Sequence, residues 1–83
     1  MGFGVQKTLG SRRHEALVAR IIEKRKAAGL TQEDLARALG EHQSFIARLE
    51  SGQRRIDVIE YLTLAEAIGF NAADEIHYMM SQD

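Results

Sequence analysis

The sequence predicts an all-α protein, a compact domain of five helices. Three observations predict this fold. Apolar residues recur at helical spacing in five separate stretches. A residue able to cap a helix precedes four of these stretches, and a glycine follows four of them. The 83 residues are 45% hydrophobic, which suffices for one small core.

The N-terminal end differs from the rest of the chain. Residues 1–10 contain three glycines and show no apolar period, which predicts a flexible arm ahead of a single domain over residues 11–83. Lys7, Arg12 and Arg13 make this end basic, so it could touch a polyanionic partner, such as the backbone or a minor groove of a nucleic acid. A plain disordered end is the alternative interpretation.

Ser11 is the expected cap of the first helix, which extends to about Ala28. Leu17 and Ile21 would face the core, with Val18 beside them. Three basic residues occupy the last turn, where the helix dipole favours cations: Lys24, Arg25 and Lys26.

Residues 31–52 predict two short helices joined by a tight corner, a helix-turn-helix. Thr31 and Asp34 form a capping-box pattern at the start of the first of them. Gly40 follows its last apolar residue, where a left-handed cap is cheapest for glycine. The apolar residues of the two helices would face one another: Leu35, Ala36 and Leu39 from the first, Ile46 and Leu49 from the second.

This pattern leaves polar side chains on the outer face of the second helix of the pair. Gln43, Ser44 and Arg48 lie there, and such side chains beside a structural corner suit reading of the DNA major groove. The alternative role for Gln43 is only to cap the helix start. Phe45 has two interpretations, packing under the fourth helix or touching a thymine methyl group.

Residues 53–56 connect this pair to a fourth helix, which Asp57 caps with Glu60 in a second capping box. Its inward face is expected to contain six residues: Val58, Tyr61, Leu62, Leu64, Ala65 and Ile68. The whole predicted core comprises Leu17, Ile21, Leu35, Leu39, Ile46, Leu49, Leu62, Ala65 and Ile68.

The last helix is expected over residues 71–81, with Asn71 as its cap and Asp74 and Glu75 as a charged first turn. One apolar stripe contains Ala73, Ile76, His77 and Met80, and Tyr78 and Met79 widen it. This is more apolar surface than one contact with a small core needs. We therefore predict a dimer interface through Ile76, Met79 and Met80.

The charge is distributed unevenly. Residues 1–55 hold all 11 basic residues against six acidic ones, a net +5, whereas residues 56–83 hold six acidic residues and no Lys or Arg, a net −6. The chain as a whole is therefore −1. Beside a helix-turn-helix, this asymmetry favours a basic face for nucleic acid, although an unevenly charged solvated surface is the bland alternative.

Several classes of site are not expected. The absence of cysteine excludes disulfides and zinc-thiolate sites. His14, His42 and His77 show no metal-ligand spacing, and no nucleophile or phosphate loop stands out. There is no apolar run long enough for a membrane span. We expect a cytosolic protein with no enzymatic activity, cofactor, metal or membrane association.

An ordered set of residues over positions 14–70 resembles the phage-repressor-type (Xre/Cro-like) helix-turn-helix family. The matching residues are Arg25, Gly29-Leu30-Thr31-Gln32, Leu35-Ala36, Leu39-Gly40, Ile46, Leu49-Glu50, Gly52, Leu64-Ala65 and Ile68-Gly69. The sequence departs from the family at Glu41, usually apolar, and at His42, where the cap is usually Ser or Thr.

The resemblance implies a lambda-repressor-like domain that binds double-stranded DNA, commonly as a dimer on a two-fold operator. It implies a structural ion pair between Arg25 and Glu50. It also implies phosphate contacts from four residues: Gln32, His42, Arg54 and Arg55. The expected function is a transcriptional regulator, a repressor acting as a homodimer. The alternative is an antitoxin-like module that binds a cognate protein through its last helix and autoregulates through DNA.

Overall fold

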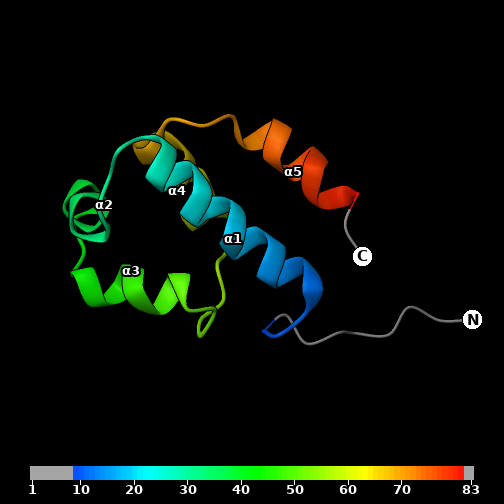
Figure 1. The fold of residues 1–83 in the computed structure, drawn as a ribbon, viewed down its shortest axis with the longest axis horizontal. Coiled ribbons are helices and arrows are strands. Elements are labelled where there is room, and N and C mark those ends of the chain that lie inside the picture. Colours follow the sequence, from blue (N-terminus) through cyan, green and yellow to red (C-terminus); the bar gives the residue numbers. More distant parts are fainter. Residues whose placement is uncertain (1–8, 82–83) are drawn as a thin grey trace, which may run out of the picture.

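The computed structural model describes residues 9–81, and their secondary structure is entirely helical (Figure 1). The helices are α1 (Arg12–Ala27), α2 (Gln32–Leu39), α3 (Gln43–Glu50), α4 (Val58–Ile68) and α5 (Ala72–Met80). The predicted all-α, five-helix fold is confirmed. The predicted arm lies outside the described residues, apart from its last two positions.

Side chains cap the starts of α1, α2 and α4 at the positions that the sequence predicted. Ser11 accepts from the backbone N–H of His14, and capping boxes begin both α2 and α4. At α2, the hydrogen bonds from Thr31 lower the pKa of Asp34 below its ordinary value. These caps satisfy N–H groups that a helix start otherwise leaves unpaired, so they fix where each helix begins.

The core lies where α2 and α3 cross and where α1 and α4 cover them (Figure 1). Its largest fully buried side chains are Ile21, Leu35, Ile46, Leu49 and Leu64. Each contributes roughly 1.5–3 kcal/mol relative to leaving it in water. Leu17 and Leu39 of the predicted core are only partly buried and pack against this cluster.

The prediction for α4 was wrong at two positions. Leu62 is 43% exposed and Val58 is 69% exposed, so neither belongs to the core. The buried stripe of α4 is Tyr61, Leu64, Ala65 and Ile68. Because α4 is apolar on more than one side, its sequence did not show which side the other helices cover. Val58 and Leu62 therefore add apolar surface to the outside of the molecule.

Helix α5 packs with a different face from the apolar stripe noted in its sequence. Ala73, Ile76, His77 and Met80 are exposed, whereas Ala72 and Met79 are half-buried and Glu75 is buried.

Glu75 was expected to be part of a charged first turn, yet it contacts α1. Arg20 donates from Nε and Nη2 to its two carboxylate oxygens at 2.7 and 2.9 Å, and Lys24 Nζ lies 3.4 Å away. The Arg20 guanidinium also lies 4.1 Å from the centre of the Tyr78 ring. A charged contact thus holds α5 on α1 and leaves its apolar stripe free.

This contact predicts an acid-dependent loss of stability. Hydrogen bonding to Arg20 holds the pKa of Glu75 below its ordinary value. A lowered folded-state pKa stabilises the fold above the unfolded pKa, about 4.3, and this contribution disappears as pH falls through the folded-state value. Glu75→Gln should therefore lower the melting temperature at pH 7, with the gap closing towards pH 3. Glu66→Gln, at an exposed position of α4, is the control. A gap independent of pH would contradict the prediction.

Candidate nucleic-acid interface

The corner between α2 and α3 determines how α3 is presented. Gly40 ends α2 in the left-handed conformation, with φ of 70°. The backbone N–H of Glu41 then donates to the carbonyl of Ala36 at 2.9 Å, which closes the end of α2. Ala36 is buried, so a small side chain lies near the corner. The chain turns at once into α3, which crosses α2 and keeps one side open to solvent (Figure 1).

The open side of α3 presents the three side chains that the sequence assigned to base reading. Gln43, Ser44 and Arg48 are all exposed, while Ile46 and Leu49 on the opposite side are fully buried. Together the three offer amide, hydroxyl and guanidinium groups, which match the donor and acceptor pattern of base edges in the major groove.

A buried ion pair holds α3 against α1. Arg25 donates from Nε and Nη2 to the two carboxylate oxygens of Glu50, at 2.6 and 2.9 Å. Its Nη1 donates to the carbonyl of Leu30 at 2.7 Å. The two side chains are only 8% and 5% exposed. The end of α1, the start of α2 and the end of α3 are therefore joined at one point, since Leu30 directly precedes the cap of α2.

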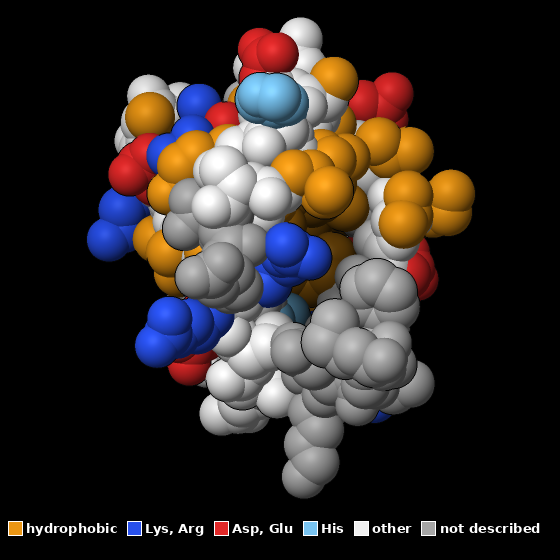
Figure 2. All heavy atoms as spheres, turned by 90° about the vertical axis from the view of Figure 1, so that its right-hand side faces the viewer, with side chains coloured by type: hydrophobic (Ala, Val, Ile, Leu, Met, Phe, Trp, Pro, Cys, Tyr) orange, Lys and Arg blue, Asp and Glu red, His pale blue; other side chains and the backbone are white. Residues whose placement is uncertain are grey.

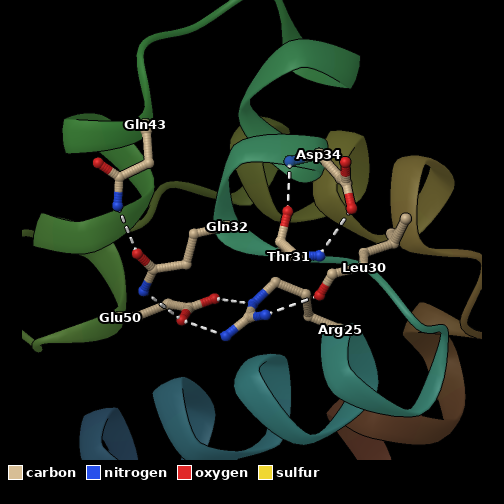
Figure 3. A network of polar contacts seen from close by, with 7 residues as sticks. All are labelled: Arg25, Leu30, Thr31, Gln32, Asp34, Gln43 and Glu50. Atoms are coloured by element: carbon tan, nitrogen blue, oxygen red, sulfur yellow. Dashed lines mark hydrogen bonds and ion pairs between the residues drawn. The ribbon is translucent and has the colours of Figure 1, made fainter.

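Two glutamines extend this ion pair to the surface (Figure 3). Gln32 Nε2 donates to Glu50 Oε1 at 2.9 Å, and Gln43 Nε2 donates to Gln32 Oε1 at 2.6 Å. The chain of contacts runs from Arg25 through Glu50 and Gln32 to Gln43. It fixes which side of the Gln43 amide faces inward, and its oxygen and second N–H remain for another partner.

These contacts refine the roles expected at the helix starts. The Gln32 side chain is engaged with Glu50 and Gln43. His42 is the N-cap of α3, and its side chain makes no capping hydrogen bond. Its exposed imidazole therefore lies beside N–H groups that a phosphate could accept from.

The two arginines after α3 lie in different surroundings. Arg54 donates to both carboxylate oxygens of Glu60, at 3.2 and 3.0 Å, and its guanidinium lies 4.5 Å from the centre of the Phe45 ring. Arg55 is exposed. Phe45 is half-buried and packs against the core. This position agrees with the first of its two interpretations, packing under the fourth helix.

Among the contacts that the sequence did not predict are Gln32 with Gln43 and Arg54 with Glu60 near the interface, and Arg20 with Glu75 between α1 and α5. Each contact joins residues on different helices, or a residue on a helix to one in a loop. Helical spacing in the sequence therefore does not predict it. Only the contact between Arg54 and Glu60 had a signal in the sequence. The capping box at Asp57 places Glu60 near the loop that carries Arg54.

Two other classes of site have no counterpart in the described part of the chain. Over residues 9–81 no helix is long and apolar enough to cross a membrane. Nor does that range contain a group of three acidic or histidine side chains placed to hold a metal ion.

Comparisons with known proteins agree with this geometry. A helix-turn-helix family model matches residues 21–74. An XRE-family like protein from Pseudomonas syringae pv. tomato is 38% identical, with a TM-score of 0.79 over 83% of this chain and 84% of that one. Among curated protein sequences, none is significantly similar to this chain.

More distant structures share the fold. The clp gene regulator ClgR from C. glutamicum is 24% identical, with a TM-score of 0.74 over 84% of this chain and 90% of its own. A mutant of the restriction-modification controller protein C.Esp1396I is 18% identical, with a TM-score of 0.76 over 84% of this chain and 93% of its own. The family match and the 38% identical relative show that the chain belongs to the Xre/Cro-like helix-turn-helix family of DNA-binding transcriptional regulators.

Proposed function

We propose that the protein represses transcription by binding a specific two-fold DNA site as a homodimer. The observation that carries the sequence-specific part is the pre-oriented Gln43 on the open face of α3, next to exposed Ser44 and Arg48. In this arrangement arginine engages guanine and glutamine engages adenine. Occupancy of the site then excludes other proteins from the same DNA.

Phosphate contacts flank the base-reading face. The start of α2 with Gln32 and the start of α3 with His42 offer backbone N–H groups and positive helix ends. Arg55 and Arg54 lie on the loop after α3 and add positive charge. For Arg54 this role requires the guanidinium to bind a phosphate and Glu60 at the same time. Such contacts position the protein on the duplex and carry no sequence information.

The second copy is proposed to bind at the exposed apolar face of α5. Ile76 is 47% exposed and Met80 is 68% exposed, with half-buried Met79 between them. Figure 2 shows the hydrophobic side chains gathered at this end of the molecule. Val58 and Leu62 of α4 add to the exposed apolar surface. A two-fold interface there would place two α3 helices about 34 Å apart, one turn of DNA.

The same face supports the second candidate function, an antitoxin-like module whose last helix binds a different protein. Purifying the tagged protein from its own host distinguishes the two. Recovery of a stoichiometric second protein bound at α5 favours the antitoxin-like function, and recovery of the homodimer alone favours the repressor.

Base reading by Gln43 is the test of the proposed function. A site is first selected from random duplexes, and binding is then compared between that site and its single-base variants. Gln43→Ala should lose about 1–3 kcal/mol on the selected site and little on random DNA, because one base contact is removed. Preference should relax at one symmetric pair of positions.

Capping is the competing role for Gln43, because His42 leaves the start of α3 without a side-chain cap. It predicts a lower melting temperature and the same loss on every duplex. Gln53→Ala, at an exposed position beyond α3, is the matched control and should leave the preference at those positions unchanged. Equal loss by Gln43→Ala on all duplexes would rule out base reading.

A further inference from the structure

A carboxylate lies against a cation of the loop that joins α3 to α4 (Figure 1). Glu60, in the first turn of α4, accepts from Nη1 and Nη2 of Arg54 at 3.2 and 3.0 Å. Both side chains are 30% exposed, so the pair is accessible from solvent. At this loop a negative charge opposes the electrostatic attraction that draws the protein to any duplex.

The Arg54 guanidinium is held in one orientation by its neighbours. Oε1 of Glu60 also accepts from the backbone N–H of Asp57 at 3.2 Å, so the carboxylate is itself fixed to the start of α4. The guanidinium lies 4.5 Å from the centre of the Phe45 ring, a cation–π distance. Phe45 belongs to α3 and directly follows Ser44 of the open face. These contacts therefore connect the loop arginine to both α3 and α4.

One edge of the guanidinium remains for DNA. Its five N–H donors lie in one plane, and the carboxylate of Glu60 takes the edge formed by Nη1 and Nη2. Within residues 9–81 no group accepts a hydrogen bond from Nε of Arg54. The edge formed by Nε and Nη2 can therefore bind two oxygens of a phosphate while the ion pair stays intact.

We propose that Glu60, acting through Arg54, determines the ratio between specific and nonspecific DNA binding. On the specific site the base contacts of α3 fix the position of the duplex, so a pre-oriented guanidinium meets its phosphate at little entropic cost. On random DNA no single position is favoured, and the carboxylate offsets the attraction of Arg54 for the phosphates nearby. This inference rests on the proposed sequence-specific function.

Glu60→Gln tests this role, because it removes the charge and keeps the shape of the side chain. Glutamine also serves in capping boxes, so α4 should keep its start. We expect the variant to bind random duplexes about threefold more tightly, with a salt dependence steeper by up to about 1, because Arg54 regains its full charge. The selected site should gain nothing, because the arginine is no longer pre-oriented. The ratio of the two affinities should therefore fall about threefold or more.

Two controls separate this role from a general effect of charge. Glu66→Gln removes an exposed carboxylate farther along α4 and should leave the ratio unchanged. In an Arg54→Ala background, Glu60→Gln should strengthen binding to both duplexes equally, because there is no arginine left to position. A fall of the ratio in that background would overturn the role through Arg54.

The ratio measured for Glu60→Gln decides between the proposal and two simpler roles. Equal strengthening on both duplexes would mean that Glu60 acts only as a surface charge. Equal weakening, with a lower melting temperature, would mean that it only braces the loop. Either result would overturn the inference and leave sequence-specific binding standing. An unmodified protein that prefers no duplex would overturn the proposed function and this inference together.

Discussion

Replacing Glu50 with alanine should destabilise the protein by about 3–5 kcal/mol, the loss expected when one member of a buried ion pair is removed. Arg25 would remain buried with its charge and only the carbonyl of Leu30 as partner. The Gln32 amide would lose its acceptor as well. A domain of this size has only about 5–15 kcal/mol of total stability, so the variant should be partly unfolded near body temperature. Urea unfolding followed by circular dichroism measures the change.

Two further variants show whether burial causes this effect. Arg37→Ala removes one side of an exposed pair, with Asp34, and should change stability by less than about 1 kcal/mol. The double variant Arg25→Met, Glu50→Leu removes both charges together and should recover much of the loss, because no buried charge remains unpaired. A Glu50→Ala protein that melts within a degree or so of the unmodified protein would contradict the prediction.

The second large effect is expected on DNA affinity. Ile76→Glu with Met80→Glu places two like charges on each side of the proposed interface. The double variant should be monomeric and should bind the selected two-fold site at least about a hundredfold more weakly, because it loses the gain from joining two half-site contacts. Each half-site should still be bound weakly, since α3 is untouched. Sedimentation and gel shifts at matched concentrations measure both quantities.

Ile59→Glu is the matched control for this experiment. Ile59 is 72% exposed on α4, but it lines a hollow beside Phe45 and Leu39. Its replacement should leave the dimer intact. If the α5 double variant is still a dimer, the interface lies elsewhere on the molecule. If the unmodified protein is still a monomer at high micromolar concentration, the proposed dimer does not form.

The helices and their starts were predictable because their signals are local. Thr31 with Asp34 and Asp57 with Glu60 satisfy neighbouring N–H groups, so a window of four residues contains the information. Gly40 marks the corner for the same reason. The exposed side of α3 followed from helical spacing once Ile46 and Leu49 were placed inside.

The features that the sequence did not predict depend on which elements meet. Leu62 looks like a core residue until the other helices are seen to cover the opposite side of α4. Glu75 looks like a solvent-exposed helix start until Arg20 is seen to reach it from α1. Burial of a charged residue depends on a partner distant in sequence, and periodicity carries no information about that partner.

The hydrogen bond between Gln32 and Gln43 has a consequence for anyone who wishes to retarget the protein to new DNA. Substituting position 43 alone introduces a new side chain and also removes the hydrogen-bond donor to the amide oxygen of Gln32. Changing position 32 alone leaves the reading amide free to rotate. The two positions therefore form one unit of specificity, divided between α2 and α3. A library that varies them together samples alternatives that scanning the recognition helix residue by residue never reaches.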